Sequence, residues 1–306
     1  MDIFTTIVPV FSIILLGWIS RKKGFIPADF IGPANALVFY IAIPAMIFSA
    51  ISKATLTAHF NFGILVITLT TALVVCILAW VFGHVCRLKQ GQLGSYVQIS
   101  FHGNLGYIGL AVAFYYLGED GFVKASILTG FLMILQNLLS VLSLTVNAHQ
   151  LDSARYGRTI VRNLAGNPVV LSAMAGIICS FLTVPIPLIV QRSLDILSGL
   201  ALPMALLIIG ASISFQDVRH KMKWVLSAIS FKLILMPGLG YVVYRVLGFS
   251  PGEYLPGLIL LASPTATISY VMAKEMKGDP DLAVIAISMC TLLSALSYTF
   301  WLNVAV

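Results

Sequence analysis

Long apolar stretches recur along almost the whole chain, and they constrain its fold more than any other feature. A helix that crosses a bilayer needs about 20 mostly apolar residues, because its backbone groups must pair internally in lipid. Ten stretches meet or approach that length, at residues 3–20, 30–51, 62–86, 94–117, 123–147, 159–182, 189–212, 223–247, 252–275 and 281–303. The connections between them are short. The sequence therefore predicts an all-α integral membrane protein without a soluble domain.

Charged residues are scarce, at 9% of the 306 residues, whereas an ordinary soluble domain has about 25%. The net charge of +7 would suit nucleic acid in a soluble protein, but these basic residues fall in the connections, where membrane topology explains them. The four cysteines lie in or at the ends of apolar stretches, without the spacing of a zinc site. We therefore expect no nucleic-acid partner, no metal and no cofactor.

Basic residues are divided unequally between the two sets of alternate connections. Thirteen of them lie in the connections around residues 21–23, 87–89, 155–162, 219–223 and 274–277. The other set holds four: Lys53, Lys124, Arg192 and Arg245. Because basic loops stay on the cytoplasmic side, the first set is expected to face the cytoplasm. This predicts a multi-pass protein of the cell (inner) membrane with both termini outside the cytoplasm.

Two segments of the first half have counterparts in the second half. The run at residues 39–48 resembles the run at 198–207, with Pro44 and Pro203 standing 159 residues apart. A similar offset places residues 103–109 of the fourth stretch on residues 263–269 of the ninth. Five stretches per half is an odd number, so the second half would enter the membrane from the opposite face. We therefore predict two inverted five-helix repeats, at residues 1–148 and 149–306.

The matched segments in the fourth and ninth stretches are rich in residues that break helices. Pro264 removes a backbone donor, and Gly103, Gly106 and Gly109 let the chain unwind. Ordinary kinked helices are the alternative, since Gly and Pro are common in membrane spans. Interrupted helices at corresponding positions of two repeats are, however, the best sequence pointer to a transporter's substrate site. Their matched places and shared polarity favour broken helices 4 and 9 that cross.

Four of these runs together resemble the auxin efflux carrier family, which includes plant auxin exporters and bacterial permeases proposed for malate and malonate. The runs are residues 42–48, 104–109, 232–237 and 263–267. The resemblance implies the broad fold of the bile acid sodium symporters, with a scaffold from helices 1, 2, 6 and 7 that often forms a homodimer. It implies a transport core from helices 3–5 and 8–10, with Asn104 at the crossing. The acidic residue that those symporters use for sodium in helix nine is missing, so sodium coupling is not implied.

An anion is the expected guest of such a crossing. Two half-helix N-termini would meet there, each carrying about half a positive elementary charge. The groups expected to hold a carboxylate are the Asn104 amide, the backbone amides around Gly106, and the hydroxyls of Thr265, Thr267 and Ser269. Tyr107 and Pro264 of the same segments complete the candidate substrate site. Asn104 could instead only pin two helices together.

Lys232 is the one basic residue that falls well inside a stretch. A charge at membrane depth costs about 2.5 kcal/mol or more, which marks such a residue as a candidate for function. Lys232 could compensate an anion, pair with backbone carbonyls of a broken helix, or change protonation during transport. It also lies nine residues beyond Lys223, so that its side chain could extend toward the cytoplasmic surface. We count it among the candidate site residues.

The sequence thus favours a secondary active transporter or uniporter that moves a small organic anion, a carboxylate, through the lipid bilayer by alternating access. An anion channel and a non-transporting membrane sensor are the alternatives. An enzyme is not expected, because the chain has no HExxH, no Gly-x-Ser-x-Gly and no paired aspartates within its stretches. ATP-driven transport would need a P-loop, which the sequence also lacks.

Overall fold

The computed structural model of the chain describes residues 3–53, 60–147, 166–213 and 221–305. Within these ranges every regular element is a helix, and β pairing is limited to one isolated antiparallel bridge between Gly103 and Thr265. Six helical segments are long and apolar enough to cross a membrane: Ala28–Ser52, Phe62–Val85, Leu105–Val146, Leu188–Ser212, Met222–Val246 and Pro280–Ala305. The predicted all-helical, multi-pass class is therefore confirmed.

Of the remaining expected stretches, the first is a full-length helix and the others are shorter or interrupted. The first is α1 (Ile3–Lys22), and the sixth is described as α9 (Pro168–Phe181). The beginning of the sixth stretch, at residues 159–165, lies outside the described residues, as do four basic residues of the proposed cytoplasmic connections, namely Arg155, Arg158, Arg162 and Arg219. Besides α1, the long uninterrupted helices are α5 (Phe62–Val85), α10 (Leu188–Ser212) and α15 (Pro280–Ala305).

The fourth and ninth stretches are each divided by a short non-helical linker. In the fourth, α6 (Gln90–Phe101) ends before residues 102–104, and a π-helical turn, η2 (Leu105–Gly109), follows. In the ninth, α13 (Pro251–Leu261) and α14 (Ile268–Glu275) flank residues 262–267. The linker at 102–104 contains Gly103 alone of the three glycines, because Gly106 and Gly109 lie inside η2. Both interruptions occur where Gly and Pro are concentrated.

The fourth and fifth stretches are joined more closely than their separate apolar runs suggested. Two helical segments, together labelled α7 (Leu110–Val146), continue from η2 through both of them and meet at a kink at Gly118. Gly118 has φ 70° and ψ −167°, a conformation that residues with a Cβ atom rarely adopt. A glycine can therefore redirect the chain here without an intervening loop, which an apolar pattern alone does not reveal.

Two further π-helical turns stand immediately before helices whose second residue is proline. One is η1 (Val38–Ala42), between α2 (Ala28–Leu37) and α3 (Ile43–Ser52); the other is η3 (Phe231–Leu235), between α11 (Met222–Ser230) and α12 (Met236–Val246). Pro237 has no N–H to donate to the carbonyl four residues earlier, that of Leu233. The Leu233 carbonyl instead accepts from Trp301 Nε1 at 2.9 Å and Ser297 Oγ at 2.8 Å. The bend thereby fastens this span to α15.

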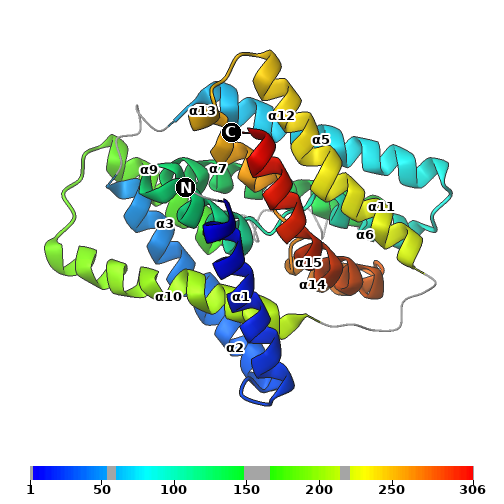
Figure 1. Cartoon of the computed structure of the whole chain (residues 1–306), viewed down its shortest axis with the longest axis horizontal. Coiled ribbons are helices and arrows are strands. Elements are labelled where there is room, and N and C mark those ends of the chain that lie inside the picture. The colour runs from blue at the N-terminus through cyan, green and yellow to red at the C-terminus, as the bar shows by residue number, and fades with distance from the viewer. Residues whose placement is uncertain (1–2, 54–59, 148–165, 214–220, 306) are drawn as a thin grey trace.

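The helices pack as two groups that are joined through α7 and through the contact of α1 with α15. In Figure 1, α1, α2, α3 and α10 lie together on one side, and α5, α6, α11, α12, α14 and α15 lie on the other. α7 packs against α3 and α9 as well as against α6 and α13. The contact of α1 with α10 is very close, because a Cβ atom on Gly17 would strike the Leu207 carbonyl and one on Gly210 would strike the Ile14 carbonyl. Small residues allow such approach between membrane helices.

Candidate functional site

The two linkers are bonded to each other through their backbones. Asn104 N–H donates to the Pro264 carbonyl at 2.7 Å, and Ala266 N–H donates to the His102 carbonyl at 2.9 Å. These bonds flank the bridge between Gly103 and Thr265. Unwound backbone must find partners where water is excluded. Here each broken helix supplies the partners of the other, so that the four half-helix ends meet at one point, which we call the linker crossing (residues 102–104 and 262–267).

Side chains of the second linker and of α7 donate hydrogen bonds to the carbonyls at the end of α6. At the end of α6, the Ile99 carbonyl accepts from Thr265 Oγ1 at 2.9 Å, and the Phe101 carbonyl accepts from Gln136 Nε2 at 3.2 Å. Gln136 also accepts from Gly103 N–H at 3.1 Å through its Oε1 atom. The last carbonyls of a helix have no intrahelical partner. Gln136, a residue of α7, thus supports the first linker with both ends of its amide.

Asn104 begins the helix that follows the first linker. Its Oδ1 atom accepts from Tyr107 N–H at 3.4 Å, as an N-cap does, and its backbone carbonyl accepts from Gly109 N–H at 3.0 Å. Its other amide atom, Nδ2, is buried and has no hydrogen-bond partner among the described residues. A buried donor without a partner costs about 1–3 kcal/mol. Asn104 therefore keeps two unused N–H groups at a helix N-terminus.

Lys232 reaches the linker crossing from η3. Its side chain is completely buried, and Nζ donates to the Leu261 carbonyl at 2.7 Å and contacts Met236 Sδ at 3.5 Å. Gly103 leaves the space that the ammonium fills, since a Cβ atom on Gly103 would lie 3.2 Å from Nζ and would overlap Ser263 Oγ. The Lys232 amine thus lies between the end of α13 and the first linker.

Comparison with known proteins decides the family. The model of the family described as "Membrane transport protein" matches residues 2–149 and 152–302. The chain belongs to this family. The match confirms the resemblance to auxin efflux carriers that the sequence motifs indicated. The alignments with relatives extend over nearly the whole length of this family member, so the linker crossing lies within the aligned region.

Two relatives of this family member carry names that describe them as transporters. A protein of Rhizobium meliloti (strain 1021) named "Putative malonate transporter" is 26% identical over 307 residues, which cover 97% of this chain and 94% of that protein. A protein of Methanocaldococcus jannaschii described as an uncharacterized transporter is 26% identical over 302 residues, 95% of each chain. The malonate name belongs to the first of these relatives.

The candidate residues of the transport protein do not all have the same surroundings. Asn104, Pro264, Thr265 and Lys232 meet at the linker crossing through the bonds described above, and all four are buried. Thr267 is half-buried just before α14. Ser269, in the first turn of α14, is fully buried, and its hydroxyl has no partner among the described residues. The hydroxyl hydrogen of Thr265, in contrast, is already donated to the Ile99 carbonyl.

One contact of the transport protein's candidate site was not anticipated. The Tyr107 hydroxyl donates to Asn35 Oδ1 at 2.6 Å and so links η2 to α2. Asn35 is a polar amide in an otherwise apolar stretch. The signal was therefore present in the sequence, but an amide gives no indication of its partner on another helix.

The space beside Gly106 differs from that beside Gly103. A Cβ atom on Gly106 would lie 3.9 Å from Met133 Cε, an ordinary van der Waals contact. We therefore expect Gly106→Ala to fold with unchanged thermal stability. If the substrate approaches this backbone, the added methyl group weakens carboxylate binding by about tenfold, which corresponds to 1.4 kcal/mol. Thermal unfolding in detergent and a binding titration measure the two effects, and unchanged affinity would exclude close approach at Gly106.

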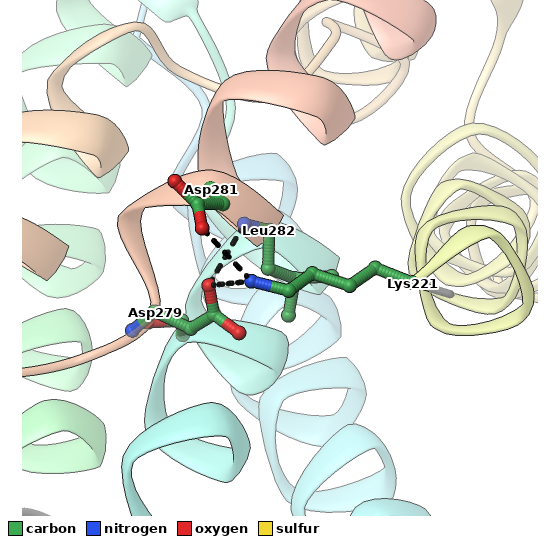
Figure 2. A network of polar contacts seen from close by, with 5 residues as sticks. Lys221, Asp279, Asp281 and Leu282 are labelled. Carbon is green, nitrogen blue, oxygen red and sulfur yellow. Dashed lines mark hydrogen bonds and ion pairs between the residues drawn. The ribbon is translucent and has the colours of Figure 1, made fainter. Parts of the chain in front are cut away.

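A polar network of the transport protein joins α6, α11 and α15 away from the linker crossing. Figure 2 shows Lys221, which precedes α11, reaching Asp279 and Asp281 at the start of α15, with Nζ distances of 2.7 and 3.2 Å. Asp279 Oδ1 also caps α15 by accepting from Leu282 N–H at 3.0 Å, and Asp279 N–H donates to Ser95 Oγ of α6 at 2.7 Å. One aspartate thus holds three helices together.

The pKa of Lys221 shows that this network favours the charged form of the lysine. Burial lowers the pKa of Lys221, but the hydrogen bonds to Asp279 and Asp281 outweigh burial and raise the pKa above its ordinary value. A lysine pKa that is raised in the folded state stabilises the fold at all pH values below the ordinary lysine pKa. The contribution is lost only as the pH rises through the raised pKa. The network therefore stays charged and intact at neutral pH.

Removing the Asp279 carboxylate tests the network. Asp279→Ala deletes a helix cap and an ion pair that is 16% exposed on the aspartate side, and we expect a loss of about 1–2 kcal/mol of stability. Asp281→Ala is the matched control. The Asp281 side chain is 68% exposed, and exposed ion pairs contribute about 0–1 kcal/mol. Thermal unfolding of both variants in detergent at pH 7 should rank them in this order, and equal transition temperatures would contradict the capping role.

Proposed function

We propose that this membrane transport protein carries a small carboxylate anion across the cell membrane by alternating access, as a secondary active transporter or a uniporter. The observation that carries the proposal is the buried, unpartnered Nδ2 group of Asn104 at the linker crossing. A donor without a protein partner is satisfied when a ligand with acceptor oxygens binds. A carboxylate supplies such oxygens.

The electrostatics of the linker crossing support an anion. The helices that begin there, η2 and α14, direct their N-termini toward the linkers, and helix N-termini favour negative charge. Lys232 adds a full positive charge next to Gly103. A cationic substrate would be repelled by all three groups. The name of the Rhizobium relative refers to malonate, a small dicarboxylate, which agrees with this polarity.

The proposed site uses the residues of both linkers and of the turns after them. Asn104 and Ser269 supply free polar groups, and the backbone amides around Gly106 and the hydroxyl of Thr267 complete the ring of donors. Tyr107, Pro264 and Thr265 shape the site from the same segments, and Lys232 provides charge. Asn104 is only 6% exposed and Thr265 only 1%, so the structure corresponds to a conformation that is closed around the site.

The proposed mechanism rests on a ten-helix plan of two inverted repeats, residues 1–148 and 149–306. In this plan the scaffold consists of α1, of α2 and α3 together, of α9 and of α10. The scaffold is also the surface implied for a homodimer. The remaining helices form the moving core. The close packing of α1 on α10 and of α3 on α9 supports a rigid scaffold. Both termini would lie outside the cytoplasm, with the connection around Lys221 inside. The hydrogen bond from Tyr107 to Asn35 crosses from core to scaffold and would break when the core moves.

A transport assay on purified protein in liposomes tests the function. Radiolabelled malonate, malate, lactate and a neutral amide of similar size are presented outside vesicles that are either empty or loaded with unlabelled malonate. We expect saturable uptake of at least one carboxylate, faster into the loaded vesicles, and no uptake of the amide. Protein-free liposomes are the control. Absence of both uptake and exchange for every anion, with binding also absent, would overturn the proposal.

The same assay separates the two alternatives. An anion channel would give uptake that does not saturate and that is not accelerated by internal malonate, because a channel needs no return step. A sensor without transport would bind a carboxylate, seen as a rise in unfolding temperature, but move none. The closed packing around the linker crossing favours the carrier, since alternating access requires conformations closed to one or both sides.

A further inference from the structure

Lys232 is a buried lysine without a carboxylate partner in the part of the chain that the structure describes. Its side chain has no exposed surface, and the ion pairs found among the described residues involve Lys53, Lys124 and Lys221 instead. An unpaired ammonium in the membrane interior is costly unless it has a specific task. Its position is fixed by η3 and by Pro237, which divert the Leu233 carbonyl to Trp301 and so orient this turn against α15. π-helical turns of this kind often lie at functional sites.

The end of α13 explains what the ammonium does. A helix leaves its last four carbonyls without intrahelical partners. At the end of α13, Leu258 accepts from Ala262 N–H, Ile259 from the Tyr298 hydroxyl, and Leu260 from Ser263. The fourth carbonyl, that of Leu261, accepts from Lys232 Nζ at 2.7 Å. Lys232 thus supplies the hydrogen-bond donor for the last carbonyl at the C-terminal end of α13.

In transporters with broken helices, unwound carbonyls and half-helix C-termini coordinate the coupling cation. In this protein the same kind of position is filled by a side chain. We propose that Lys232 is the resident cation of the linker crossing: its ammonium takes the place of a co-transported alkali cation, so that carboxylate transport requires none. This inference rests on the proposed carboxylate transport, and it assigns Lys232 a positioning role at the end of α13 in addition to its charge.

The packing of Gly103 agrees with a built-in cation. A Cβ atom on Gly103 would lie 3.2 Å from both Nζ and Cε of Lys232 and would overlap Ser263 Oγ of the second linker. Nζ is therefore bonded to the end of α13 and lies beside the first linker. Removing the aminobutyl group leaves an enclosed space lined by the Leu261 carbonyl, which a small free cation of similar size can enter.

The test compares wild type with Lys232→Ala in liposomes made without alkali cations, with N-methylglucamine as the only cation. We expect wild-type malonate exchange to be the same in this medium and in sodium or potassium. Lys232→Ala should slow exchange by about tenfold or more, the effect of losing a hydrogen bond to a charged group. Adding ethylammonium, or sodium, should restore at least part of the rate in Lys232→Ala and have no effect on wild type. A role in packing alone would not respond to an added cation.

Two further variants keep the result decisive. Lys223→Ala removes an exposed positive charge from the same span and should leave exchange unchanged. Lys232→Met retains bulk without charge and should be slow and insensitive to ethylammonium, because its side chain fills the space. Wild-type exchange that depends on sodium, or normal exchange by folded Lys232→Met, would overturn the inference. Either result would leave carboxylate transport itself established, whereas a wild type that neither binds nor exchanges any carboxylate would remove the proposed function and this inference with it.

Discussion

Asn104→Ala is expected to abolish carboxylate exchange at low substrate concentration while leaving the protein folded. The variant removes the buried Nδ2 donor, and a hydrogen bond to a charged group contributes about 1.5–3 kcal/mol, or roughly 10- to 100-fold in affinity. The structural loss should be smaller, because the cap to Tyr107 N–H is long, at 3.4 Å, and a cap contributes about 1 kcal/mol. Exchange rates measured across a range of malonate concentrations, with binding measured separately, distinguish the two effects.

Asn137→Ala is the matched control for Asn104. The Asn137 side chain donates only to the Met133 carbonyl of its own helix, so its loss should change neither affinity nor exchange. Asn104→Asp gives a second comparison, since it keeps the shape and the cap but replaces the donor with a negative charge that repels a carboxylate. If Asn104→Ala and Asn104→Asp both bind malonate as the wild type does, Asn104 only pins the linkers together and the proposed site is wrong.

Gly103→Ala should be the most damaging change at the linker crossing. The new methyl group would overlap Ser263 Oγ and press on the end of Lys232, both of which are completely buried. Overpacking in a closed interior costs about 1–3 kcal/mol, and here it would also lengthen the backbone hydrogen bond from Asn104 to Pro264. We expect a lower unfolding temperature together with loss of exchange, in contrast to Gly106→Ala, whose methyl group has room.

A second substitution shows whether the clash is the cause. Ser263→Ala removes the overlapping hydroxyl at the cost of its hydrogen bond to the Leu260 carbonyl. The double variant with Gly103→Ala should therefore be more stable than the two separate losses added together, and such coupling is expected for residues in contact. Unfolding temperatures and malonate exchange of the four proteins complete the cycle. Strict additivity would show that Gly103 is required for its backbone conformation and not for the space it leaves.

The candidate site could be located from the sequence, but the roles of its side chains could not. Gly103 and Pro264 weaken helices through their own backbone chemistry, so the positions of the interruptions follow from residue type. The sequence left four roles open for Lys232. In the structure its ammonium is buried and bonded to the Leu261 carbonyl, and it does not extend to the surface. Asn35 was missed because its partner, Tyr107, lies 72 residues away in the chain.

The sequence by itself determined that the chain is an all-helical membrane protein of the membrane transport family. Apolar length decides the class, because backbone groups in lipid must pair within each helix, and the motifs of the second, fourth, eighth and ninth stretches are local. Only the tertiary structure decided which buried polar groups are used and which stay free. Thr265 and Asn104 are both polar residues in broken stretches, yet the first is bonded to the Ile99 carbonyl and the second keeps an unpartnered donor. That difference depends on which helix ends meet across the chain, and no local pattern specifies it.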